Sequence, residues 1–310
     1  MDKMDKVEIK TDLALERRES YSGTNVEIDG VGIWEKEYKG VKTTTVDIFT
    51  KEGAKLMGKP LGKYITLEMN SDMLYDESKN IISVLSKEIK KLIPKGIDGP
   101  ILVVGLGNRE VTPDALGPQV AGELNISRHL IDNGGICAVV PGVMAQSGME
   151  SAEIVKGIVE EIDVKCVIAI DSLAARSVKR LCNTIQLTDT GITPGSGVGN
   201  YRSGLNIDTI NVPVIAIGVP MVVDAATIVL DTMDALIKVL DENSKTDGFV
   251  KIISDFHNED KYQLVKELLE PQIGTLYVTP KDIDENVVIM SKIISAAINK
   301  ATNGNNIKTF

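Results

Sequence analysis

The chain has 310 residues, of which 34 are Lys or Arg and 44 are Asp or Glu, so its formal net charge is −10. Such an acidic chain lacks the basic surface that displaces counterions from a phosphate backbone, so no direct binding to nucleic acid is expected. Hydrophobic residues make up 43 % and aromatic residues 4 % of the chain, which excludes wholesale disorder and indicates an aliphatic core.

The chain carries no recognisable targeting signal. It begins with charged residues and no apolar segment follows them, and the apolar stretch Val212–Val223 is too short and too interrupted by Pro and Gly to span a membrane. Three cysteines occur without a Cys-x-x-Cys pair, which is typical of reduced thiols. These features predict a cytoplasmic protein with no membrane association.

Two patterns of secondary structure follow one another along the chain. Short extended runs at residues 26–28, 43–48 and 64–67 predict a small antiparallel unit. From Ile101 onward, apolar strand-like runs alternate with helical patterns, with strands predicted at residues 101–104, 137–140, 166–170 and 214–217. We therefore predict an α/β fold with a mostly parallel sheet flanked by helices and a small N-terminal antiparallel β unit.

Acidic residues follow three of the predicted strands. In such a sheet, ligands bind beyond the carboxyl ends of the strands, so Asp114, Asp171 and Asp224 are the candidates for a common site. A long glycine-rich loop at residues 188–200 is the other unusual feature.

Several familiar sites are absent from the sequence. The Gly105-Leu106-Gly107 run has Glu110 where a dinucleotide fingerprint needs its third glycine. With only two histidines, His129 and His257, and no cysteine pair, a tight zinc site is not expected. Asp189-Thr190-Gly191 is similar to the triplet of pepsin-type proteases, but it occurs once, so we interpret it as loop architecture.

Two facing carboxylates would suit acid–base chemistry. If Asp114 and Asp171 lie across a cleft, one of them keeps a proton, and the pair can activate a water while polarising a carbonyl group. Each aspartate could instead simply cap a helix. Asp224 is an accessory candidate with the same alternative, the cap of a helix over residues 225–240. The residues alone leave these interpretations open.

Longer motifs make a family recognisable. Gly105-Leu106-Gly107-Asn108 with Asp114–Pro118 resembles the opening motif of the hydrogenase-maturation endopeptidase fold, and a larger set of motifs resembles the germination protease of spore-forming bacteria. The resemblance runs from about Thr11 to the last predicted helix, over nearly the whole chain. Its motifs are residues 11–14, 111–118, 128–130, 141–144, 168–171, 173–176, 189–200 and 213–220.

The resemblance implies an atypical aspartic-type endopeptidase that initiates the degradation of small acid-soluble spore proteins. It also implies a homotetramer in the spore core, no cofactor, and catalytic aspartates at Asp114 and Asp171. Family substrates are cut after an acidic residue, in a sequence that Thr11-Asp12-Leu13-Ala14 copies. We therefore expect residues 1–12 to be a propeptide removed between Asp12 and Leu13.

The remaining chain, residues 13–310, is expected to form a single α/β protease domain. Its β-rich subregion is residues 13–95 and its α/β core is residues 96–310. Two alternatives stay open at this point: a metal-dependent maturation endopeptidase, and a non-catalytic protein that binds an anion or nucleotide in the glycine-rich loop.

Overall fold

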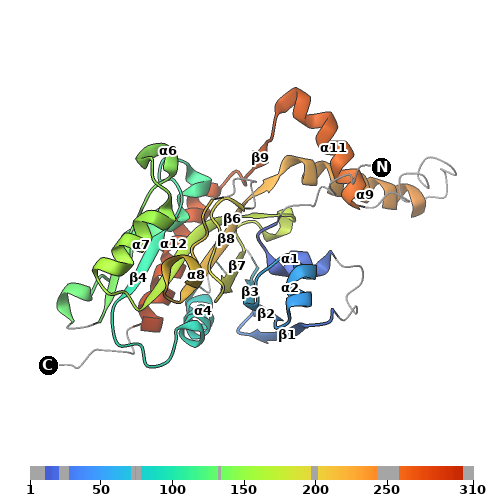
Figure 1. The fold of residues 1–310 in the computed structure, drawn as a ribbon. Coiled ribbons are helices and arrows are strands. Elements are labelled where there is room, and N and C mark those ends of the chain that lie inside the picture. The colour runs from blue at the N-terminus through green and yellow to red at the C-terminus, as the bar shows by residue number, and fades with distance from the viewer. Residues whose placement is uncertain are drawn as a thin grey trace.

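The computed structural model describes residues 11–20, 28–70, 74, 78–131, 134–196, 202–242 and 258–302. Within these ranges the chain forms one mixed sheet with helices on both faces (Figure 1). The strands are β1 (Val31–Tyr38), β2 (Val41–Ile48), β3 (Gly62–Glu68), β4 (Ile101–Gly105), β5 (Ile136–Val139), β6 (Cys166–Ala175), β7 (Thr184–Thr188), β8 (Val214–Asp224) and β9 (Tyr277–Val278).

The helices differ widely in length. The α-helices are α1 (Ala14–Glu19), α2 (Lys51–Met57), α4 (Ser78–Leu92), α5 (Leu116–Gly122), α6 (Met144–Ser147), α7 (Ser151–Glu161), α8 (Ile207–Ile210), α9 (Ala225–Glu242), α11 (Asn258–Ile273) and α12 (Ile283–Thr302). Short 3₁₀ helices are η1 (Thr112–Asp114), η2 (Arg128–Leu130) and η3 (Val178–Arg180). Among the helices in the described ranges, none is long and apolar enough to cross a membrane.

The strand order is β1-β2-β3-β7-β8-β6-β4-β5, with β9 paired to β8. The strands β5, β4, β6 and β8 are parallel neighbours, as the α/β pattern predicts. The antiparallel unit contains β2 and β3 at the runs predicted for residues 43–48 and 64–67, but its third strand, β1, lies at Val31–Tyr38 and not at residues 26–28, of which only Ile28 is described and is outside any strand. Strand β7 pairs antiparallel with both β3 and β8 and so joins the two parts into one sheet. The sequence pattern predicts no strand at Thr184–Thr188, and its glycine-rich loop begins at the last residue of β7.

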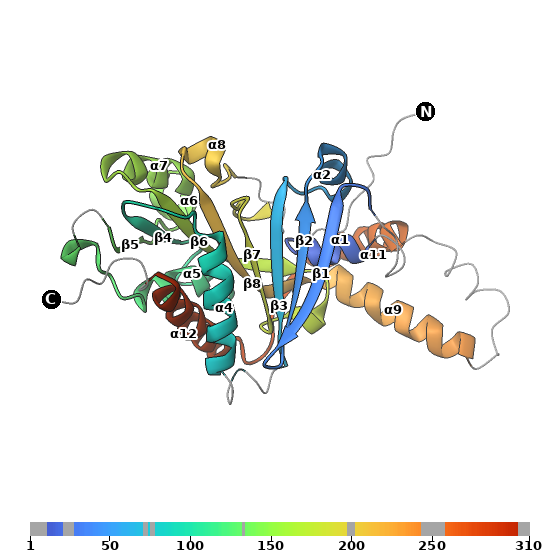
Figure 2. The same ribbon diagram turned by 90° about the horizontal axis from the view of Figure 1, so that it is seen from below.

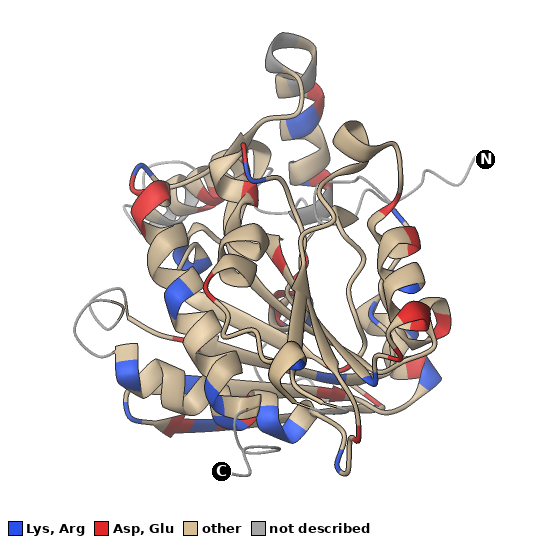
Figure 3. Ribbon diagram, turned by 90° about the vertical axis from the view of Figure 1, so that its left-hand side faces the viewer, with Lys and Arg blue, Asp and Glu red and all other residues tan. Residues whose placement is uncertain are grey.

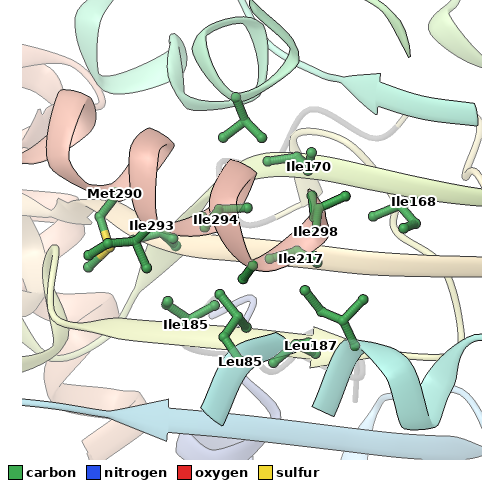
Figure 4. Packing of buried hydrophobic residues seen from close by; sticks show 14 of the residues in the cluster. Leu85, Ile168, Ile170, Ile185, Leu187, Ile217, Met290, Ile293, Ile294 and Ile298 are labelled. Carbon is green, nitrogen blue, oxygen red and sulfur yellow. The ribbon is translucent and has the colours of Figure 1, made fainter. Parts of the chain in front are cut away.

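Successive side chains of the central strands point to opposite faces of the sheet, so the hydrophobic core is divided into one cluster on each face. Ile168 and Ile170 of β6 point to the face covered by α4, α5 and α12, while Val167 and Ala169 point to the face covered by α7 and α8. Figure 4 shows Leu85 of α4 and Ile294 of α12 with the larger cluster over the sheet, and Figure 2 shows α4 and α12 side by side.

Helices α9 and α11 form a separate layer. They pack on each other through a small apolar cluster of their own, distinct from the clusters on the sheet, and lie away from α4 and α12 (Figures 1 and 2). The charged residues lie mainly on the outer helices and loops, with both signs interspersed (Figure 3).

Candidate active site

Asp171 lies within β6 and not after it. The sequence predicted that the strand ends at Ile170, but β6 runs on to Ala175 and pairs Asp171 with Gly218 of β8. No helix begins there, so the interpretation of Asp171 as a helix cap is wrong. The side chain is 6 % exposed, and its Oδ1 accepts a hydrogen bond of 2.9 Å from the Ser172 amide.

Asp114 is held over the loop that follows β4. It ends the 3₁₀ helix η1, and its Oδ2 accepts a hydrogen bond of 2.8 Å from the Asn108 amide. Helix α5 begins at Leu116 with Ala115 as its N-cap residue, so Asp114 does not cap that helix. Its carboxylate instead accepts a hydrogen bond from the loop. Gly107 permits this approach, because its φ is +104° and a Cβ there would lie 2.1 Å from the Asp114 carbonyl oxygen.

The two aspartates line one cavity of about 560 Å³ at the carboxyl ends of the parallel strands. Asp12, from the segment before α1, lines the same cavity, as do Arg202 and Tyr277. The structure thus brings Asp12, Asp114 and Asp171 together, with a guanidinium group among them.

Burial and mutual repulsion separate the acidities of these carboxyls. Burial raises the pKa of Asp171 well above its ordinary value, and the charges of Asp114 and Asp12 raise it further. Burial also raises the pKa of Asp114, while the hydrogen bond from the Asn108 amide and the charge of Arg202 oppose this rise. The cavity therefore favours a protonated Asp171 beside a carboxylate at Asp114.

The predicted processing site enters this cavity. The Asp12 carboxylate accepts hydrogen bonds of 2.9 Å from the Ala174 amide and 2.8 Å from the Ser196 hydroxyl. Leu13 is fully buried behind it. Residues 1–10 of the expected propeptide lie outside the described residues.

Asp224 is not part of the cavity. It stands at the start of α9, where its Oδ1 accepts a hydrogen bond of 2.9 Å from the Ala226 amide. Its Oδ2 accepts a hydrogen bond of 2.6 Å from the Tyr262 hydroxyl. The structure therefore places Asp224 as the cap of α9, the alternative that the sequence offered, and does not bring it to Asp114 and Asp171.

Two residues of the site escaped the sequence interpretation. Ser196 belongs to the glycine-rich loop, whose residues 197–200 lie outside the described residues, and Arg202 follows that loop closely. In the sequence, the position of Arg202 just after the glycine-rich loop was the signal that could have indicated its place in the site. Asp189 has the expected loop role, because its Oδ1 accepts a hydrogen bond of 2.8 Å from the Lys63 amide.

The one histidine within the described residues does not line the cavity. His129 lies in η2, outside the cavity lining, and His257 lies outside the described residues. Within the described ranges, no group of three or more His, Cys, Asp and Glu side chains is placed to hold a metal ion.

Comparison with known proteins identifies the family. The sequence model of germination proteases matches residues 6–248 and 238–308. The chain belongs to the germination protease family. Germination proteases from Clostridium perfringens strain ATCC 13124 and Caldanaerobacter subterraneus subsp. tengcongensis are 43 % and 44 % identical to it, over 96 % and 94 % of both chains. That of Bacillus subtilis strain 168 is 39 % identical over 94 % of this chain and 93 % of its own.

Membership in the germination protease family assigns the chain a protease function in germination, and therefore a hydrolase activity. Among solved structures, a NiFe hydrogenase maturation protease from Thermococcus kodakarensis is similar to 68 % of this germination protease chain and 98 % of its own. The two are 14 % identical, with a TM-score of 0.35.

Proposed function

We propose that the chain is an endopeptidase in which Asp114 and Asp171 act as a pair, and that it initiates the degradation of small acid-soluble spore proteins in the spore core. The observation that carries this proposal is the shared cavity, which is lined by the buried carboxyl of Asp171 in β6 and the half-buried carboxyl of Asp114 in η1, with acidities driven apart by burial and charge. That arrangement supplies an acid and a base at one point.

The roles follow from the directions of the pKa shifts. Asp171, whose pKa is raised by burial and by two neighbouring acids, keeps its proton and donates it to the carbonyl oxygen of the scissile peptide. Asp114, whose carboxylate is supported by the Asn108 amide and by the charge of Arg202, takes a proton from the attacking water. No cofactor enters these steps.

The same cavity supports self-processing of a precursor. Asp12 lines it together with Asp114 and Asp171, so the bond between Asp12 and Leu13 starts next to the proposed acid and base. Acidification would neutralise crowded carboxylates and so favours the approach of this segment to the pair. Residues 1–12 are, on this proposal, a propeptide.

The test of the pair is isosteric substitution. Asp114→Asn and Asp171→Asn are each expected to lower the cleavage of a small acid-soluble spore protein by at least ~10²–10⁴-fold, because an amide cannot exchange the proton. Fragments are measured by mass spectrometry. Asp163→Asn is the matched control, since that side chain is 81 % exposed and remote from the cavity lining.

Cleavage at the rate of the unmodified enzyme in either variant would remove that aspartate from the mechanism. Strong inhibition by a chelator, reversed by one added metal ion, would favour a metal-dependent peptidase instead.

The same variants test processing. After mild acid treatment, N-terminal sequencing is expected to find a new terminus at Leu13, and this terminus is expected to be absent in Asp171→Asn. A fully active enzyme that keeps Met1 would contradict the propeptide proposal.

A further inference from the structure

Glu16 is a buried carboxylate next to the predicted processing site. Its side chain is 2 % exposed, and its two oxygens accept hydrogen bonds of 2.7 Å from the Arg176 amide and 2.9 Å from the Ser177 amide. Both amides directly follow β6, the strand that carries Asp171. Glu16 therefore joins α1 to the end of a strand that lines the cavity.

One hydroxyl group separates this carboxylate from the main-chain nitrogen at the expected cut. The Leu13 amide donates a hydrogen bond of 3.1 Å to Thr11 Oγ1, and the Thr11 hydroxyl donates to Glu16 Oε2. Thr11 lies before the cut and Leu13 lies after it. Processing therefore withdraws the bridging hydroxyl, so Glu16 loses one donor and the Leu13 nitrogen loses its acceptor.

Leu13 itself is held by contacts that processing leaves intact. Its side chain packs with Leu173 and Ala175, and both Leu13 and Ala14 are fully buried. The Ala14 amide donates a hydrogen bond of 2.7 Å to Gln186 Oε1, and this bond lies on the mature side of the cut. The Leu13 nitrogen is thus kept close to the carboxylate that it contacts through Thr11 in the precursor.

The charges around Glu16 favour an added cation. The guanidinium of Arg180 is shared by three carboxylates of α1 and β3, which are Glu16 at 3.4 Å, Glu19 at 2.7 Å and Glu68 at 3.1 Å. These four side chains carry a net negative charge. Lys59 is the positive group on the other side, and its Nζ donates at 3.0 Å to the carbonyl oxygen of the scissile bond, which leaves with the propeptide. Because the Glu16 carboxylate is already buried in the precursor, only the arriving cation must still be desolvated.

We infer that the Glu16 carboxylate is a binding site for the α-ammonium group that processing creates on Leu13. This rests on the proposed function. Hydrolysis breaks the bond between the Asp12 carbonyl carbon and the Leu13 nitrogen; the hydroxyl of the water joins the carbon and its hydrogen joins the nitrogen. The new amine takes up the proton that the new Asp12 carboxyl group releases, since α-amino groups are ordinarily protonated near neutral pH. The ammonium group then replaces the Thr11 hydroxyl as the donor to Glu16, and it fixes the mature terminus to α1 and to the end of β6.

Competitive acetylation of the terminal amine tests this site. The full chain is processed by mild acid, and the mature protein is mixed with a free peptide that has the sequence of residues 13–15. The mixture is treated with a trace of acetic anhydride from about pH 6 to about pH 10, and mass spectrometry measures the acetylated fraction of each terminal amine. Because an ammonium group paired with a carboxylate keeps its proton, the midpoint of labelling is expected at least about one pH unit above that of the peptide. At pH 7 the protein amine should react at least ~10-fold more slowly.

Substitution of two neighbouring carboxyls separates the effect of charge from that of burial. Glu16→Gln keeps the size of the side chain and removes its charge, so the midpoint is expected to return to within about half a pH unit of that of the peptide. Glu19→Gln is the matched control, because that side chain is 51 % exposed and its hydrogen bonds go to Arg180. The control should keep the upward shift.

A midpoint equal to or below that of the peptide would overturn the site, even if labelling reaches a lower plateau, because burial alone then shields the amine. The same shift in Glu16→Gln as in the unmodified protein would also overturn it. The unmodified protein decides the first point by itself if Glu16→Gln does not fold. Absence of a new terminus at Leu13 would contradict the proposed processing and the site with it, whereas a new terminus with an unshifted midpoint would contradict the site alone.

Discussion

Asp171 ties the stability of the protein to pH. Folding raises the pKa of this carboxyl by burial and by the charges of Asp114 and Asp12. Between the unfolded and folded pKa values the folded state binds the extra proton, so this contribution to stability is complete at pH below the ordinary carboxyl pKa and is lost as pH rises through the raised pKa.

Asp171→Asn removes that titration while keeping the acceptor for the Ser172 amide. Its melting temperature is expected to match that of the unmodified protein near pH 4 and to exceed it increasingly toward pH 8. Calorimetric scans at stepped pH measure the gap. A gap that does not change with pH would mean that Asp171 does not titrate between folded and unfolded states in this range.

Gly107 determines where Asp114 can lie. Alanine at this position combines a φ of +104° with a contact of 2.1 Å to the Asp114 carbonyl oxygen, so the loop must move. We expect Gly107→Ala to lower hydrolysis by at least ~10²-fold, comparable with the loss of an acid–base group. Its unfolding free energy should fall by about 1–3 kcal/mol.

Gly122→Ala is the matched control. A Cβ at this position, the end of α5, meets no atom within 4 Å. The control should keep full activity and gain up to about 1 kcal/mol of stability from helix propensity. Normal hydrolysis in Gly107→Ala would show that the loop can adjust without moving Asp114.

At the level of elements, a cluster of ion pairs around the partly buried Arg180 holds α1 against the sheet. Arg180, in η3, bonds Glu19 at 2.7 Å and Glu68 at 3.1 Å and lies 3.4 Å from Glu16. The Glu16 side chain is 2 % exposed and also accepts from the Arg176 amide at 2.7 Å. Since α1 directly follows Asp12 and Leu13, this cluster holds the segment that enters the cavity.

Arg180→Met is expected to cost about 3 kcal/mol of unfolding free energy, because it leaves the Glu16 carboxylate buried without its cation. Denaturant titration measures the loss. Lys165→Met, which breaks an exposed pair with Asp163, should cost no more than about 1 kcal/mol. If adding Glu16→Gln to Arg180→Met recovers no stability, the unpaired charge is not the cause.

At the scale of the whole molecule, α9 and α11 present apolar side chains to solvent in a single chain. Leu236 of α9 and Leu264 and Leu268 of α11 are each at least 50 % exposed. Apolar surface of this kind marks contact sites between chains. The resemblance to germination proteases implies a homotetramer, so we expect these helices to form contacts between chains and light scattering to give the mass of four chains.

Leu264→Ser with Leu268→Ser should lower that mass, whereas Leu130→Ser, at a position 74 % exposed in η2, should not. A monomer mass for the unmodified protein would contradict the homotetramer.

The sequence predicted the α/β class, the parallel strands and the antiparallel unit, because alternation and apolar runs report directly which side chains are buried. It ended β6 at Ile170, because the polar Asp171 follows, and β8 at Ile217, because Gly218 and Pro220 normally mark a turn. Asp171 departs from that rule, because β6 continues through this buried carboxyl to Ala175.

Strand β7 was missed although its residues Thr184–Thr188 alternate, because a strand inside a loop-like stretch is defined by its partners β3 and β8. The hydrogen bonds that hold Asp12 could not be predicted for the same reason. Asp12 and Gln186 are 174 positions apart, and no local pattern reports that distance.

This separation has a consequence for the order of folding. Apart from Lys59, the contacts of Asp12 come from β6, β7 and the glycine-rich loop, so this segment has its full set of partners only after Ser196 has been synthesised. Contacts between positions so far apart form late, because the chain between them must be ordered first. The segment around Asp12 therefore reaches its bound position late in folding. A cut after Asp12 would then occur only in a chain that has already folded.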